Sequence, residues 1–261
     1  MRTVGVMFPG EVKVPGTDSV ENKSGTMYSV LLVPVVKEPK PGTNEVSKAF
    51  DECWIGSDGY LKADGTRQHK AIAWQGHVVN DNGQTITDIF VSDIPDDLPE
   101  WVQQNPASAG ATKLPEAPPV IQHRRISFMQ DGVSATPRHW LRSTPDGSLI
   151  GFFREDKNKI VQLWVISPNG GEPRQLSHLP SSASGPFNFS YDGKYASMLA
   201  DERVWIVDIA NGNTFPVTEN KGVGYEPNGA VIWSPRNEVF FNRVIKGRKG
   251  TFRQICTVSL K

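Results

Sequence analysis

The feature that most constrains the fold is a repeat of about 45 residues in the second half of the chain. Each unit contains an apolar stretch that ends in Ser or Thr, a turn, two apolar strands and a short final strand. The turns begin at Pro145, Tyr191 and Pro235, so the intervals are 46 and 44 residues. A period in the forties with four strands per unit is typical of a β-propeller, in which four-stranded sheets, or blades, stack around an axis. The repeat therefore predicts an all-β fold.

The repeat divides residues 1–261 into the blades of a single domain. Complete blades are predicted at residues 138–177 and 186–218, and the unit at 230–261 is incomplete because it has three strands. One four-stranded sheet cannot bury both of its faces alone, so we expect the apolar side chains to pack between neighbouring blades.

An earlier, diverged blade is predicted at residues 27–128. Its expected strands are Met27–Val36, Lys70–Val79, Thr87–Asp93 and Arg124–Phe128. Residues 37–68 and 94–120 are rich in Pro, Gly and charged residues and are predicted to be loop insertions. Glu45–Trp54, in the first insertion, is interpreted as a short helix.

The two ends of the sequence leave two architectures open. Residues 1–8 read as an orphan outer strand, and the last unit lacks a fourth strand. In one alternative the first strand completes the last blade and closes a propeller of about four blades. In the other, the chain is part of a larger propeller.

Composition and charge narrow the classes of partner. The chain has 28 basic and 28 acidic side chains, so it lacks the positive field that attracts nucleic acid or an anionic membrane. No apolar run approaches the roughly 20 residues of a membrane span, and the start is too short and too soon broken for a signal peptide. We expect a soluble protein, cytoplasmic as given, or periplasmic if the chain is a fragment of a longer secreted protein.

Several segments resemble a known kind of propeller repeat. Thr144–Gly147, Gln162–Ser177 and Ser190–Gly193 resemble the TolB-type, WD40-like (PD40) repeat. Arg124–Phe128 and Pro137–Arg142, together with residues 44–56, resemble an uncharacterised bacterial family of TolB-like propellers, the YidR-type proteins. The resemblance implies a propeller in which this sequence corresponds to the C-terminal part of longer members. The family has no established activity to transfer.

Candidate site residues follow from the geometry of a propeller, in which the first strand of each blade lines the central channel. Aligning the blades on Thr144, Ser190 and Ser234 brings one polar cluster to a channel mouth. The predicted ligand-binding residues are Arg138, His139, Arg142, Asn188, Glu226 and Asn228. Two arginines suit a carboxylate or a phosphate, because a guanidinium can bind either with two parallel hydrogen bonds.

His139 is the candidate catalytic or metal-binding residue. Oligogalacturonate lyases, which are TolB-like propellers, hold a divalent metal with channel-facing histidines, and His139 has a comparable position. A metal site needs three or four ligands, and the other histidines show no ligand spacing. The alternative is a hydrogen-bonded structural histidine beside Trp140.

Three functional hypotheses result. The first is a non-catalytic binding or scaffold protein whose ligand is a protein or a glycan, with no cofactor. The second is a lyase or hydrolase of acidic oligosaccharides, assisted by a divalent metal such as Mn or Ca and similar to the oligogalacturonate lyases. The third is a remnant with an incomplete site. A homodimer in which two half-propellers complete each other is an additional alternative.

Overall fold

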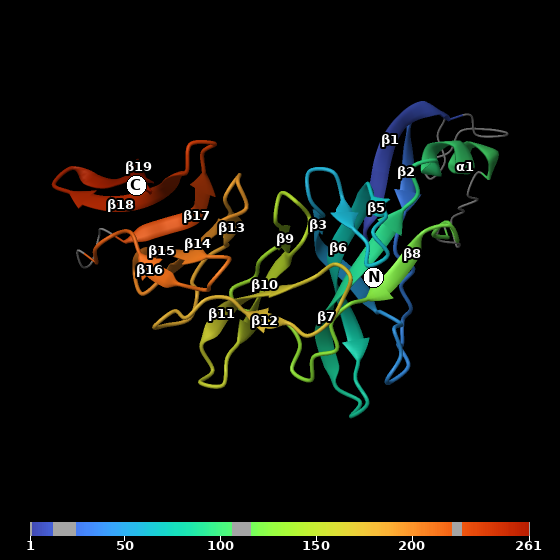
Figure 1. Ribbon diagram of the computed structural model, residues 1–261, viewed down its shortest axis with the longest axis horizontal. Coiled ribbons are helices and arrows are strands. Elements are labelled where there is room, and N and C mark those ends of the chain that lie inside the picture. Colours follow the sequence, from blue (N-terminus) through green and yellow to red (C-terminus); the bar gives the residue numbers. More distant parts are fainter. Residues whose placement is uncertain (1, 13–24, 106–115, 221–225, 261) are drawn as a thin grey trace.

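The computed structural model describes residues 2–12, 25–105, 116–220 and 226–260. Its sheets follow one another in chain order, with the N-terminal sheets at one end of the row and β19 at the other (Figure 1). All strand pairs are antiparallel, and the only helix in the described ranges is the short α1 (Leu98–Gln104). The all-β, propeller-type fold predicted from the repeat is confirmed.

Three blades have four strands each. In the first blade the order is β3 (Lys48–Trp54), β6 (Lys70–Val79), β7 (Thr85–Ile94) and β8 (Gln122–Arg125). In the second it is β9 (Arg142–Ser143), β10 (Ile150–Glu155), β11 (Val161–Ile166) and β12 (Arg174–Gln175). In the third it is β13 (Asn188–Phe189), β14 (Tyr195–Ala200), β15 (Arg203–Asp208) and β16 (Thr214–Pro216).

The fourth sheet has three described strands, β17 (Pro227–Trp233), β18 (Glu238–Gly247) and β19 (Gly250–Ser259). The inner strands of successive blades, β3, β9, β13 and β17, are neighbours in space. The chain enters each blade through its inner strand and leaves through an outer one. The N-terminal ends of the inner strands, here called the leading ends, therefore lie on one side of the molecule. Their C-terminal ends, here called the trailing ends, lie on the other side.

The hydrophobic core is divided into layers between neighbouring blades. Leu141 and Phe152 of the second blade are buried with Ile89 of the first, and Phe153 is buried with Phe187 and other residues of the third. Val231 and its neighbours close a further layer between the third and fourth sheets. This arrangement agrees with the expectation that each sheet buries its two faces against its neighbours.

The N-terminal strand differs from the expectation. β1 (Gly5–Val12) pairs with β2 (Gly25–Leu31), with Val6 opposite Val30, so residues 1–8 contain no orphan strand and Met27–Val36 does not begin the first blade. The hairpin buries an apolar face against the first blade, and Arg2 O accepts a hydrogen bond from Ala49 N–H. These contacts place β1 far from β19, so the N-terminal strand does not close the fourth sheet (Figure 1).

The two insertions contain regular structure. Glu45–Trp54 was expected to be helical, but Lys48–Trp54 is the inner strand β3, because its apolar side chains pair with β6 and enter the core. A short hairpin, β4 (Tyr60–Leu61) with β5 (Arg67–Gln68), follows it. In the second insertion, α1 buries Leu98 and Val102 and has a proline in its first turn, where a missing N–H costs nothing.

Candidate functional site

Side chains alternate between the core and the open side along the segment that leads into β9. His139 and Leu141 are buried, with 2% and 0% exposure, whereas Arg138, Trp140 and Arg142 are exposed or half-buried. Alternation is the rule for an extended chain that packs one face against a core. The two predicted arginines therefore lie on the open side, and His139 faces the interior.

Both ring nitrogens of His139 are used inside the protein. Phe153 N–H donates to Nε2 at 2.9 Å, and Nδ1–H donates to Pro137 O at 3.0 Å. The ring packs near Phe153 and Phe187, with centroid separations of 4.7 and 6.1 Å. Burial lowers the pKa of His139, which favours the neutral ring that these bonds require. In contrast to the expectation of a channel residue, His139 offers no free nitrogen to a metal or substrate.

The charge of Arg138 is balanced by a buried carboxylate. Its guanidinium donates to both oxygens of Asp51, at 2.7 and 3.1 Å, and Arg2 Nη2 lies 3.5 Å from the same side chain. Asp51 sits at a bulge of β3 with a φ of 51°, a conformation that Asp tolerates better than most residues. This ion pair joins the first blade to the segment before β9.

Arg142 and Asn188 meet as predicted. Arg142 Nε donates to Asn188 Oδ1 at 3.2 Å, and Asn188 Nδ2 donates to Val231 O at 2.7 Å, so the two side chains connect three consecutive inner strands. A second guanidinium nitrogen, Nη1, donates to Leu141 O. Within the described ranges no carboxylate lies at ion-pair distance from Arg142.

Arg142 opens onto a cavity of about 330 Å³ at the trailing ends of the inner strands, here called the trailing cleft. It is lined by Trp54, Gly56, Ser57, Arg142, Ser143, Thr144, Pro145, Asn188, Phe189, Ser190 and Tyr191. Trp54 and Tyr191 are 55% and 63% exposed. Thr144 and Ser190 use their hydroxyls in local turns, so the groups left for a ligand include the guanidinium, the two aromatic side chains and the hydroxyl of the exposed Ser57.

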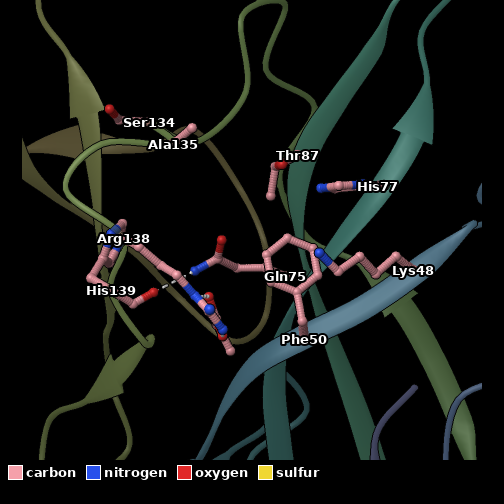
Figure 2. A pocket seen from close by; sticks show the side chains of 10 residues that line it. Lys48, Phe50, Gln75, His77, Thr87, Ser134, Ala135, Arg138 and His139 are labelled. Carbon is pink, nitrogen blue, oxygen red and sulfur yellow. Dashed lines mark hydrogen bonds and ion pairs between the residues drawn. The ribbon is translucent and has the colours of Figure 1, made fainter. Parts of the chain in front are cut away.

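A second cavity, of about 200 Å³, lies at the leading ends of the inner strands, between the first blade and the segment before β9 (Figure 2). This leading cleft is lined by Lys48, Phe50, Asp51, Gln75, His77, Thr87, Ser134, Ala135, Arg138 and His139. The predicted cluster is therefore divided, with Arg138 and His139 at one cleft and Arg142 and Asn188 at the other. Asn228 is exposed on β17, and neither it nor Glu226 lines either cleft.

Other chemistry-bearing groups are limited. In the part of the chain that the structure describes, no three His, Cys, Asp or Glu side chains come together as a metal site. Cys53 and Cys256 are free, and burial raises the pKa of Cys53 to about 12, so its thiol stays protonated at neutral pH. No helix among the described residues is long and apolar enough to cross a membrane.

Trp54 and Tyr191 in the trailing cleft, and Lys48 and Gln75 in the leading cleft, were not predicted from the sequence. Tyr191 directly follows the Ser that ends an inner strand, which the alignment of the blades could have shown. Trp54 and Lys48 could not be predicted in this way, because their strand, β3, was expected to be part of a loop insertion.

Successive antiparallel sheets with their inner strands side by side define the β-propeller class of fold. No family model matches the chain. It is 32% identical over 242 residues to the uncharacterised protein YidR of Escherichia coli, an alignment that covers 90% of this chain and 55% of YidR. The chain is thus similar to YidR, and it spans about half the length of that relative.

Other similarities are more distant. The uncharacterised peptidase YuxL of Bacillus subtilis is 24% identical over 124 residues, which cover 46% of this chain and 16% of YuxL. TolB from Acinetobacter baumannii is 18% identical with a TM-score of 0.42, and the match covers 78% of this chain and 41% of TolB. An oligogalacturonate lyase in complex with manganese is 14% identical with a TM-score of 0.41, and the match covers 74% of this chain and 55% of the lyase.

Proposed function

We propose that this chain is a non-catalytic binding module that holds an acidic glycan in the trailing cleft. The observation that carries the proposal is the half-buried Arg142, which has no carboxylate at ion-pair distance in the described ranges. A cation withdrawn from water favours an anionic partner, and a guanidinium binds a carboxylate through paired hydrogen bonds. The bond from Nε to Asn188 fixes the orientation of the guanidinium before a ligand arrives.

The two exposed aromatic side chains favour a sugar as the rest of the ligand. Trp54 and Tyr191 line the same cavity as Arg142 and present large ring surfaces to solvent. Aromatic side chains combine apolar area with a polar atom and lose little entropy on binding, which suits a ring with one apolar face and many hydroxyls. A peptide with an acidic side chain is the competing ligand, and the experiment below distinguishes the two.

The lining of the cleft supports binding rather than catalysis. It contains no His, Asp, Glu or Lys, the side chains that most often transfer protons in enzymes. The metal-assisted lyase hypothesis relied on His139, whose nitrogens are both occupied by backbone groups. We therefore propose neither a Mn nor a Ca cofactor, and we propose neither nucleic acid nor a membrane as partner.

The test is calorimetric titration of the full chain with uronate oligosaccharides, with neutral oligosaccharides of the same length and with an acidic peptide. We expect saturable binding of the uronates alone, weakened about tenfold or more in Arg142→Gln, because a hydrogen bond to a charged group contributes about 1.5–3 kcal/mol. Trp54→Ala should also weaken it, because the sugar loses an aromatic surface on which to pack. Arg253→Gln, on the exposed strand β19, is the control. Tighter binding of the neutral sugars or of the peptide contradicts the proposal, as does cleavage of the uronate.

A further inference from the structure

We propose that the leading cleft is a second binding site, for a small carboxylic acid with a hydrogen-bond donor beside the carboxylate, such as a 2-hydroxy acid or a 2-amino acid. The cleft lies at the other end of β3 from the trailing cleft and shares no lining residue with it. The inference is therefore independent of the proposed function.

Positive charge is in surplus around the leading cleft. Arg2 and Arg138 share the single carboxylate of Asp51, which is 2% exposed. Lys48 lies on the opposite wall, with its ammonium 4.4 Å from the centre of the Phe50 ring and no carboxylate at ion-pair distance among the described residues (Figure 2). An ammonium held against an aromatic face beside a neutralised carboxylate favours a small anion.

Gln75 adds a requirement that a simple anion does not meet. The residue is 4% exposed, and its Nε2 donates to His139 O at 3.1 Å. The carboxamide oxygen has no partner in the described part of the chain, and Figure 2 shows it turned away from His139 toward the cavity. Because this oxygen faces the cavity, a ligand that supplies an O–H or N–H there gains a hydrogen bond that a simple anion does not.

The remaining wall adds no negative charge. Burial first, and then the charge of Lys48, lower the pKa of His77, so its ring is neutral at physiological pH, and its edge contacts Phe50 at a centroid distance of 4.8 Å. Thr87 faces the same space (Figure 2). A cavity of about 200 Å³ has room for a small organic acid.

The test uses four probes of one carbon skeleton, titrated into the full chain and followed by calorimetry: lactate, alanine, propionate and lactamide. Propionate keeps the anion and lacks the donor, whereas lactamide keeps the hydroxyl and lacks the charge. We expect lactate or alanine to bind saturably and at least about tenfold more tightly than propionate and lactamide, because each of these leaves one group of the cleft unpaired.

Variants assign the binding to the cleft. Lys48→Gln should abolish lactate or alanine binding, while Lys70→Gln, at the opposite end of the same sheet and paired only with exposed Asp96, should leave it unchanged. Trp54→Ala, in the trailing cleft, should also leave it unchanged, which separates this site from the proposed glycan site. Equal binding of propionate, absence of saturable binding by any probe, or unchanged affinity in Lys48→Gln would overturn the inference.

Discussion

His139 stabilises the fold through a single protonation state. Its neutral ring accepts one hydrogen bond from the backbone and donates another, and its faces pack near Phe153 and Phe187. A proton on Nε2 would remove the acceptor that Phe153 N–H needs. The same residue therefore links local packing of two blades to the pH of the solution.

Removing this side chain should cost stability rather than binding. We expect His139→Ala to lower the free energy of unfolding at pH 7.5 by about 2–4 kcal/mol, because a buried N–H loses its partner and a cavity opens beside two phenylalanines. Urea denaturation measures the loss. His178→Ala, at an exposed position, is the control and should change stability by less than about 0.5 kcal/mol. A loss equally small in His139→Ala would contradict the assigned role.

The pH dependence of stability follows from the same group. Burial is the main cause that lowers the pKa of folded His139, so the unfolded chain binds a proton at a higher pH than the folded chain does. Stability should therefore fall as the pH drops below the ordinary value of 6.5, and less steeply in His139→Ala than in the natural chain. His77 and His123 have lowered pKa values too and account for slope that remains in the variant. Identical slopes would show that His139 does not titrate in this range.

The candidate site could be predicted in part from the sequence. Aligning the blades correctly brought Arg142 and Asn188 together, because equivalent positions on neighbouring inner strands are close in any propeller. The alternation of polar and apolar residues from Arg138 to Arg142 already indicates that His139 shares a face with Leu141. The sequence does not show which charged side chains pair with each other, because partners such as Asp51 and Arg138 are 87 positions apart.

At the scale of elements, the turns after β9, β13 and β17 share a residue in the left-handed conformation. Thr144 Oγ1 donates to Asp146 in the second blade, and Ser190 Oγ donates to Asp192 in the third. The glycines that follow have φ values of 74° and 69°. In the fourth sheet Asn237 takes this position with a φ of 59°. The same turn is thus built three times with different residues.

Two equivalent glycines should respond differently to substitution. A Cβ at Gly147 would lie 2.0 Å from Gly59 O, whereas at Gly193 its nearest contact is a side-chain atom of Pro145 at 3.4 Å. Gly193→Ala should cost about 1–2 kcal/mol, the penalty for a left-handed alanine, and Gly147→Ala at least about 2 kcal/mol more because backbone must move. Chemical denaturation of both variants measures the difference, and equal losses would show that the loop at Gly59 yields freely.

The repeat predicted the elements well where blades are regular and poorly in the diverged blade. The central strands of the second and third blades coincide with continuous apolar runs, because both of their faces are buried. In β3 the bulge between Phe50 and Cys53 shifts the alternation of side chains by one residue, so no single period fits Glu45–Trp54. The pairing of β1 with β2 was hidden for a different reason, because it depends on which sheet lies next to the N-terminal segment.

For the molecule as a whole, the described sheets form an open row. β19 is bonded to β18 on one side only, and most of its side chains are exposed, including Phe252 and Ile255. An unpaired strand edge can accept another strand. The homodimer considered from the sequence remains a proposal, and this edge is a surface where it can be tested.

Hydrogen exchange should distinguish an open edge from a covered one. In the monomer we expect the amides of β19 that point away from β18 to exchange near the unprotected rate, while the amides of β11, which is paired on both sides, are slow. A dimer that covers the edge would protect the outward amides, and their protection would rise with protein concentration. Full protection of β19 at every concentration would contradict the open edge.

The bonds from Arg142 to Asn188 and from Asn188 to Val231 join three blades in series, and each core layer lies between two neighbours only. In such a linear array the stability of a blade is the sum of its own folding free energy and the free energies of its interfaces with its two neighbours. Unfolding can then begin at an end of the row, proceed blade by blade and stop at the most stable interface between two blades. A closed ring has no end at which unfolding can begin in this way, so an open row of blades can lose its outermost unit and keep the rest folded.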